Sequence, residues 1–170
     1  MARAPLVAVC GPGRATAEEE WLAEAVGRGL AEAGAVVLCG GLGGVMAAAA
    51  RGARAAGGLC VGLLPGDDPE EAAPEVGLAL PTGLGELRNG VLVRACAAVV
   101  AIGGAHGTLS EIALALRIGR PVVGLHTWEL RAPGAAGPDP GVVTAGSAAE
   151  AVDRVLTAIA RRGDVLGDVL

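Results

Sequence analysis

The stretch Ala97–Ile112, AAVVAIGGAHGTLSEI, contains an apolar run, a glycine-rich loop and the start of a helix in direct succession. The run Ala98–Ile102 predicts a buried strand, and a helix is expected to begin at Thr108 after the loop Gly103–Gly107. Glycine lets the backbone approach a ligand closely, and the first N–H groups of a helix have no partner within that helix. The succession therefore predicts an anion site, with a phosphate group as the expected ligand.

The rest of the chain alternates short apolar strands with helices. The strands lack polar alternation, which indicates a sheet buried on both faces, and helical crossovers indicate that the sheet is parallel. The predicted fold class is α/β, a Rossmann-like doubly wound parallel sheet with helices on both faces, and residues 1–170 are expected to form one domain. The predicted strands are Leu6–Cys10, Val36–Cys39, Cys60–Leu64, Val76–Leu80, Ala98–Ile102 and Val122–Leu125. The predicted helices are Glu18–Ala33, Val45–Ala56, Glu86–Cys96, Thr108–Gly119 and Ala148–Arg161.

Ligands of such folds bind beyond the carboxyl ends of the strands. Three predicted strands end directly before glycine, at Cys10, Cys39 and Ile102, so the loops that follow them should meet at one crevice.

The composition argues against several classes of protein. A net charge of −5 and the absence of Phe and Tyr argue against nucleic-acid binding. No apolar run is suited to crossing a membrane, and the N-terminus enters a strand almost at once, so a cytoplasmic location without a signal peptide is expected. The chain has no lysine, which excludes a pyridoxal-phosphate aldimine and a Walker-type loop. The four cysteines form no CxxC pair and lie in or beside apolar runs, which favours buried free thiols over a metal site.

A second glycine loop, Gly40-Gly41-Leu42-Gly43-Gly44, follows the second predicted strand. Its place on the ligand side favours a binding role, and the alternative is a tight turn with close packing. NAD is not expected, because the loop Gly11-Pro12-Gly13 lacks the third glycine and no acidic residue ends the second strand. The candidate binding residues of these two loops are Gly11, Gly41, Gly43, Gly44 and Met46.

Thr108 and Glu111 allow two interpretations. Their T-x-x-E pattern is typical of a capping box, in which Glu111 would bond back to the N–H group of Thr108. Alternatively, Glu111 faces a ligand. Arg88 is either a structural arginine or a ligand for phosphate, to which its guanidinium fork is suited. His106 is either an exposed loop residue or part of the binding loop.

Together, the segments Gly40–Met46, Arg88-Asn89 and Gly103–Glu111 resemble the Lonely Guy family of cytokinin riboside 5′-monophosphate phosphoribohydrolases, many of which are labelled possible lysine decarboxylases. The motif of that family reads PGGxGTxxE and follows an Arg-Lys pair by sixteen residues, as Gly104 follows Arg88 here. Three positions differ from the motif, which makes the chain similar to a divergent branch that resembles molybdenum-cofactor carrier proteins. Gly103 replaces the proline, Ala105 replaces the second glycine, and Asn89 replaces the lysine.

The resemblance implies hydrolysis of the N-glycosidic bond of a nucleoside 5′-monophosphate to a free base and ribose 5-phosphate, with no cofactor and no metal. Glu111 would activate water or stabilise the developing positive charge, and Arg88 would anchor a charged group or assist the leaving base. The alternative is a non-catalytic binding or carrier protein for a phosphorylated ligand, either a nucleotide or the molybdenum cofactor. The expected catalytic residues are Arg88 and Glu111, and the expected phosphate-binding residues of the motif loop are Gly103, Gly104, Ala105, His106, Gly107 and Thr108.

The predicted helix Glu86–Cys96 is apolar on more than one face, through Leu87, Val91, Leu92 and Val93. Such a helix is either fully internal or part of a subunit contact. A homodimer or homotetramer is therefore expected.

Overall fold

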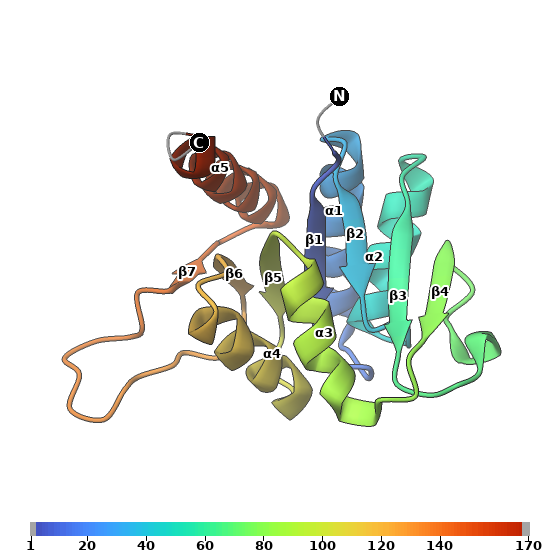
Figure 1. Cartoon of the computed structure of the whole chain (residues 1–170), viewed down its shortest axis with the longest axis horizontal. Coiled ribbons are helices and arrows are strands. Elements are labelled where there is room, and N and C mark those ends of the chain that lie inside the picture. Colours follow the sequence, from blue (N-terminus) through green and yellow to red (C-terminus); the bar gives the residue numbers. More distant parts are fainter. Residues whose placement is uncertain (1–2, 168–170) are drawn as a thin grey trace.

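The computed structural model describes residues 3–167, in which a seven-stranded sheet carries helices on both faces (Figure 1). All strand pairs are parallel, and their order across the sheet is β4-β3-β2-β1-β5-β6-β7. The strands are β1 (Leu6–Cys10), β2 (Val36–Cys39), β3 (Cys60–Leu64), β4 (Leu78–Pro81), β5 (Ala98–Ile102), β6 (Val122–Leu125) and β7 (Val142–Thr144). The helices are α1 (Ala17–Glu32), α2 (Val45–Ala55), α3 (Arg88–Ala95), α4 (His106–Arg117) and α5 (Ala148–Gly167), with short 3-10 turns η1 (Pro69–Glu71) and η2 (Gly85–Leu87). The Rossmann-like doubly wound fold is thus confirmed.

The sheet separates two apolar cores, because successive residues of each central strand point to opposite faces. In β1, Val7 and Val9 pack into a core with α1, α2 and α5, whereas Ala8 and Cys10 pack into a second core with α3 and α4. Figure 1 shows α3 and α4 in front of the sheet and α1 and α2 behind it. Strands buried on both faces explain the continuous apolar runs of the sequence.

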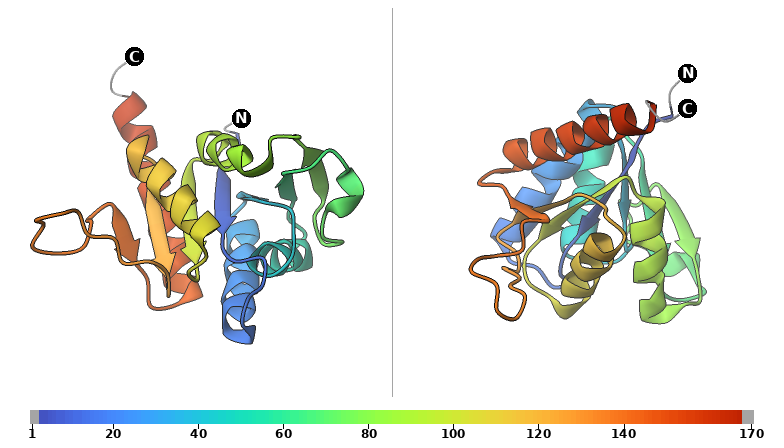
Figure 2. Two further views of the ribbon diagram at one scale, coloured as in Figure 1. Left: turned by 90° about the horizontal axis from the view of Figure 1, so that it is seen from below. Right: turned by 60° about the vertical axis from the view of Figure 1, so that its left-hand side comes forward.

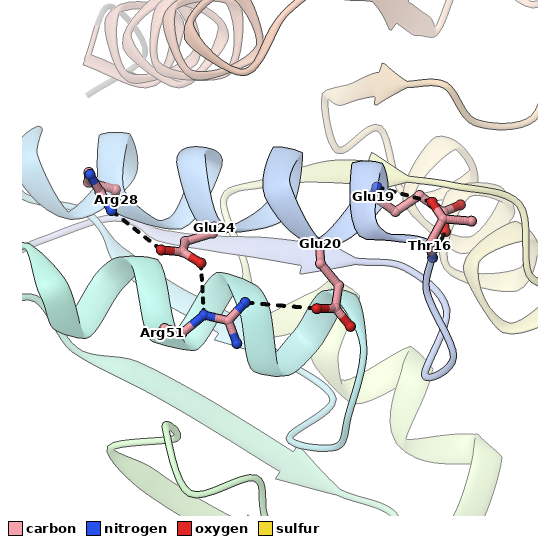
Figure 3. A network of polar contacts seen from close by, with 6 residues as sticks. All are labelled: Thr16, Glu19, Glu20, Glu24, Arg28 and Arg51. Carbon is pink, nitrogen blue, oxygen red and sulfur yellow. Dashed lines mark hydrogen bonds and ion pairs between the residues drawn. The ribbon is translucent and has the colours of Figure 1, made fainter.

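Helices α1 and α2 are in close contact because each has a glycine where the other passes. A Cβ at Gly27 would lie 2.8 Å from the carbonyl carbon of Ala49, and one at Gly52 equally close to that of Glu24. Solvent-side ion pairs join the same helices: Arg51 Nε lies 2.7 Å from Glu24 Oε2 and Arg51 Nη2 lies 3.9 Å from Glu20 Oε2 (Figure 3).

The start of α1 is closed by a capping box. Thr16 Oγ1 accepts a hydrogen bond from the Glu19 N–H at 3.2 Å, and the Thr16 N–H donates to Glu19 Oε2 at 2.8 Å (Figure 3). Two N–H groups that the helix itself leaves free are satisfied in this way.

The prediction that a helix begins at Thr108 is wrong by two residues. Ala105 has extended backbone angles (φ −79°, ψ 156°) and is the N-cap of α4, so Gly107 and Thr108 lie inside the first turn. No side chain caps this helix, which rules out the capping-box interpretation of Thr108 and Glu111. Gly107, expected in the loop, lies in the first turn of the helix instead.

Three further elements differ from prediction. Strand β4 begins at Leu78 instead of Val76, and the predicted helix Glu86–Cys96 is divided into η2 and α3. Strand β7, at the edge of the sheet, was not predicted, because it has three residues and follows a loop rich in Pro and Gly. Figure 2 shows that this loop, between β6 and β7, extends outward from the sheet and helices. Within residues 3–167 no helix has the length and apolar character that a membrane span requires.

Candidate functional site

A cavity of about 370 Å³ lies beside the carboxyl ends of β1 and β2. Strands β2, β3 and β4 follow one another on one side of β1, and β5, β6 and β7 follow one another on the other side. The direction in which the chain adds strands to the sheet therefore reverses beside β1, next to the cavity. Doubly wound sheets bind their ligands at such a point, which agrees with the expectation from the three glycine loops. The residues that line the cavity are Val9, Cys10, Gly11, Pro12, Gly13, Gly40, Leu42, Met46, Pro65, Gly85, Glu86, Arg88, Asn89, Ala105, Gly107, Thr108 and Glu111.

The predicted site residues divide into two groups. Seven of them line the cavity together and come from four separate segments of the chain: Arg88, Glu111, Gly11, Met46, Ala105, Gly107 and Thr108. The others do not line it. Five lie in the adjoining loops, Gly41, Gly43, Gly44, Gly103 and Gly104, and His106 is the first residue of α4.

The glycines outside the lining are required by the backbone around the cavity. Gly41 has φ +80° and faces β3, where a Cβ would lie 2.7 Å from Leu64 Cδ2. Gly44 has φ +60° at the start of α2, and a Cβ there would lie 2.8 Å from the carbonyl oxygen of Gly13. Gly103 has φ +71°, a conformation closed to proline, so the replacement of the motif proline has a structural reason. These residues shape the loops from which the lining residues project.

Gly40 leaves the space that the guanidinium of Arg88 occupies. A Cβ at Gly40 would lie 2.5 Å from Arg88 Nη1 and 2.6 Å from Met46 Sδ, both closer than atoms can approach. Any side chain at this position would therefore displace Arg88. The first glycine of the loop after β2 thus acts by its lack of a side chain.

Arg88 and Glu111 face each other across the wall of the cavity and are almost fully buried. Only 8% of Arg88 and 6% of Glu111 are exposed, and Arg88 Nη1 lies 3.7 Å from Glu111 Oε1. That separation is longer than a hydrogen bond. Arg88 Nε is buried with no hydrogen-bond partner among the described residues. Burying a cation whose partner lies beyond hydrogen-bond distance lowers the stability of the fold, and an anion bound in the cavity would offset that loss.

Glu111 is in a setting that favours its protonated form. Burial raises the pKa of this carboxyl above its ordinary value, while a hydrogen bond with the Cys10 thiol and the charge of Arg88 partly oppose the shift. Burial and the neighbouring Glu111 raise the pKa of Cys10 well above its usual range, so Cys10 is a neutral thiol beside the carboxyl. Position 111 can therefore hold or transfer a proton at the cavity wall.

The first turn of α4 offers donors to the same cavity. Ala105, Gly107 and Thr108 line it, and the first N–H groups of a helix have no partner within the helix. Thr108 is 1% exposed, and its hydroxyl oxygen lacks a hydrogen-bond partner within the described residues. Buried hydroxyls normally have a partner, so this one is available to a ligand.

The loop that leads into α4 is held from outside by the segment after β6. Thr127 Oγ1 donates to the Gly103 carbonyl at 2.6 Å, and Trp128 Nε1 donates to the Ala105 carbonyl at 3.1 Å. The ring of His106 lies against that of Trp128, with 5.9 Å between centroids. His106 thus supports the loop from the side away from the cavity lining.

Sequence reasoning missed several residues of the site. Gly40 belongs to the recognised glycine loop, but only the position of Arg88 reveals its role. The structure confirms the expected burial of the free Cys10 thiol, which lies close enough to Glu111 to lower the pKa of that carboxyl. Residues 3–167 contain no group of three or more His, Cys, Asp or Glu side chains suited to a metal ion.

Comparisons with known proteins find similar structures along most of the chain. One is the molybdenum cofactor binding protein from the phototrophic bacterium Rippkaea orientalis, which is 32% identical to this chain with a TM-score of 0.83. The aligned region covers 94% of this chain and 99% of that protein. Another is the molybdenum cofactor carrier protein of Chlamydomonas reinhardtii, which is 31% identical with a TM-score of 0.78. The aligned region covers 93% of this chain and 99% of that protein. An uncharacterized protein of Archaeoglobus fulgidus is 40% identical over 119 residues, which are 70% of this chain and 78% of that protein.

The family match runs through nearly the whole chain and includes every residue that lines the cavity. Residues 4–163 match the SLOG cluster4 family. The chain belongs to the SLOG cluster4 family.

Proposed function

We propose that this protein binds a phosphorylated small molecule in the cavity and carries it without cleaving it, with the molybdenum cofactor as the preferred ligand. The observation that carries the proposal is a pair of buried, unpartnered polar atoms at the cavity wall, Arg88 Nε and Thr108 Oγ1. Unsatisfied buried groups are rare in folded proteins, and two of them at the wall of one cavity are groups that a ligand bound there would complete.

Arg88 supplies the positive charge for the phosphate group of the ligand. Its guanidinium is fixed between Gly40 and Glu111, and the remaining donors of the fork can bond phosphate oxygens in the geometry to which arginine is suited. The start of α4 adds backbone N–H groups and the favourable end of the helix dipole. A phosphate group would therefore lie between Arg88 and Thr108.

The relatives support the molybdenum cofactor as the ligand. Two structures similar to this chain along almost their entire length belong to proteins described as binding or carrying that cofactor. Gly103, Ala105 and Asn89 point the same way, because these residues depart from the motif of the Lonely Guy phosphoribohydrolases.

The second candidate is hydrolysis of a nucleoside 5′-monophosphate at its N-glycosidic bond. The observation that favours it is Glu111, a buried carboxyl with a raised pKa beside the proposed phosphate site. A carboxyl in this setting is suited to exchanging a proton with water or with a leaving base. In the carrier, the same carboxyl would instead bond a polar group of the ligand.

One binding and turnover experiment separates the candidates. The purified chain is incubated anaerobically with the molybdenum cofactor and, in parallel, with AMP, GMP, IMP and a cytokinin nucleotide. Gel filtration followed by metal and phosphate analysis measures what the protein retains, and chromatography measures free base. Arg88→Met and Thr108→Val test the site, and Arg51→Met serves as the control because Arg51 pairs with Glu24 on another face.

The proposal predicts that the protein retains the cofactor, that Arg88→Met abolishes retention, and that no nucleotide releases its base. Release of base by the wild type, lost in Glu111→Gln, would replace the carrier with the hydrolase. A protein that neither retains the cofactor nor releases base would contradict both candidates.

A further inference from the structure

A carboxyl group lies at the wall of the proposed phosphate site, among groups that otherwise donate hydrogen bonds to an anion. Thr108 and Glu111 are three positions apart on α4, so their side chains project from the same side of the helix, and both line the cavity. Glu111 is only 6% exposed. An ionised carboxylate in this position would repel an anion bound to Thr108 Oγ1 and Arg88 Nε. A proton held between the two acidic groups would replace that repulsion by a hydrogen bond.

The guanidinium of Arg88 leaves the Glu111 carboxyl available to a ligand. Arg88 Nη1 lies 3.7 Å from Glu111 Oε1, which is longer than a hydrogen bond, and Arg88 Nε has no partner among the described residues. The same guanidinium therefore faces Glu111 with one nitrogen and offers another to an anion. An anion bound at Arg88 Nε would lie beside the Glu111 carboxyl.

The charges around the cavity favour a ligand that carries a proton. Arg88 is the one cation among the residues that line it, whereas Glu86 and Glu111 contribute two carboxyls. The thiols of Cys10 and Cys39 are also close enough to interact with the charge of Glu111, and burial keeps Cys10 neutral by raising its pKa. A dianion would therefore enter a cavity with more acidic than basic side chains, and a proton bound with it would reduce that excess.

We infer that Glu111 determines specificity by sharing one proton with the phosphate group of the ligand, so that the cavity accepts phosphate and phosphate monoesters and discriminates against sulfate. This inference rests on the proposed function and names the class of anion that the site selects. It gives the buried carboxyl a role in a carrier that cleaves no bond.

Phosphate suits this arrangement because its last proton titrates near neutral pH. The second pKa of a phosphate monoester is about 6. Its P–O–H group donates to the Glu111 carboxylate, or the protonated carboxyl donates to the dianion, and both forms contain one proton between the two groups. The resulting hydrogen bond involves a charged acceptor and is therefore strong.

Sulfate has the same tetrahedral shape but holds no proton near neutral pH. It can only accept hydrogen bonds, so it binds beside Glu111 only after the carboxyl has taken up a proton from solvent. Burial raises the pKa of Glu111 above its ordinary value, so sulfate binding is expected at low pH and is lost as pH rises through that pKa. Phosphate brings its own proton and therefore remains bound to higher pH.

Titration calorimetry of the full chain with inorganic phosphate and with sulfate, at equal ionic strength and across a pH series, tests the inference. At neutral pH the wild type should bind phosphate at least about tenfold more tightly than sulfate, which corresponds to one hydrogen bond to a charged group. The affinity for sulfate should fall at lower pH than the affinity for phosphate. Glu111→Gln should bind the two anions within about twofold of each other, because its amide N–H group donates to either one.

Glu24→Gln is the matched control, because it makes the same exchange in the exposed pair with Arg51, and it should keep the preference of the wild type. Circular dichroism spectra verify that each variant is folded, and the pH profiles of the wild type decide the matter if Glu111→Gln does not fold.

Equal binding of phosphate and sulfate by the wild type, binding of neither, coincident pH profiles, or an unchanged preference in Glu111→Gln would overturn the inference. The carrier role survives any of these results if the wild type still retains the molybdenum cofactor through Arg88. A wild type that binds neither anion and does not retain the cofactor would contradict the proposed function as well.

Discussion

Two arginine–glutamate pairs of this protein have opposite properties. Arg51 and Glu24 join α1 and α2 on the surface, where Arg51 Nε lies 2.7 Å from Glu24 Oε2 and both side chains are more than 30% exposed. Arg88 and Glu111 lie at the cavity wall, 3.7 Å apart and about 10% exposed or less. The exposed pair has the shorter contact, although exposed charges are solvated and depend less on pairing than buried ones. The buried pair leaves Arg88 Nε without a partner within the described residues, as expected if a third, anionic group completes it in the proposed function.

The starts of α1 and α4 differ in the same way. Thr16 and Glu19 close the first with a capping box, whereas no side chain caps the second and its Thr108 hydroxyl has no partner within the described residues. One helix start is complete within the chain, and the other leaves donors that, in the proposed function, a ligand completes.

The largest effect is expected at the two arginines. Arg88→Met should lower the affinity for the phosphorylated ligand about a hundredfold, since hydrogen bonds to charged groups contribute about 1.5–3 kcal/mol each. Arg51→Met should leave the affinity unchanged and cost under about 1 kcal/mol of stability, as exposed ion pairs do. Titration calorimetry with the ligand and urea unfolding of both variants measure the two quantities. Equal losses of affinity would remove the distinction between the pairs.

Gly40→Ala should weaken binding about tenfold, the loss of one good hydrogen bond to a charged group, because the new Cβ would displace the Arg88 guanidinium. Gly137→Ala is the control, since a Cβ at that position meets nothing within 4 Å. The same calorimetric titration applies. Unchanged affinity in Gly40→Ala would show that the position of Arg88 is unimportant for binding.

The two threonines at helix starts should respond in opposite ways. Thr16→Val should cost about 1 kcal/mol of stability through loss of the cap and leave ligand affinity unchanged. Thr108→Val should leave stability unchanged or raise it, because the hydroxyl it removes is buried without a partner, and should lower ligand affinity about fivefold to tenfold. Urea unfolding and ligand titration of both variants decide the matter. A destabilised Thr108→Val protein with full affinity would contradict the assignment.

The smallest effect concerns pH. Burial raises the pKa of Glu111 in the folded protein above its ordinary value of 4.5, which applies in the unfolded chain. The folded protein therefore keeps this proton to higher pH. The contribution to stability is complete below the unfolded pKa and is lost as pH rises through the folded pKa.

Compared with Glu111→Gln, the wild type should lose unfolding free energy as pH rises from about 4.5, the ordinary pKa of the carboxyl. Because Arg88 lowers the pKa of Glu111, Arg88→Met should extend this loss to higher pH. Urea unfolding across a pH series gives the profiles. Parallel profiles for the wild type and Glu111→Gln would show that the carboxyl is not perturbed.

Much of the fold could be predicted because its signals are local. The apolar runs of β1, β2, β3, β5 and β6 and the glycines after them predicted the strands, the parallel sheet and the side on which the cavity lies. Strand β7 has three residues and forms only by pairing with Val122–Gly124 of β6, so its own sequence carries little signal. Likewise, the start of α4 depends on the extended backbone of Ala105, which hydrogen bonds from the segment after β6 help to hold.

The candidate site was predicted less completely. Arg88, Glu111 and Thr108 carry chemistry that their residue types reveal. The role of Gly40 beside Arg88 and the effect of Cys10 on the pKa of Glu111 arise only when segments far apart in the sequence meet in space. The pattern T-x-x-E fitted two helix starts equally well, and only the backbone distinguishes Thr16, which caps α1, from Thr108, which does not cap α4.

The most direct test of the central claim is a crystal structure of the protein with the molybdenum cofactor bound. We predict that phosphate oxygens of the cofactor lie within hydrogen-bond distance of both Arg88 Nε and Thr108 Oγ1, between the loop after β2 and the first turn of α4. A cofactor phosphate bound elsewhere, with these two atoms still unpartnered, would contradict the claim.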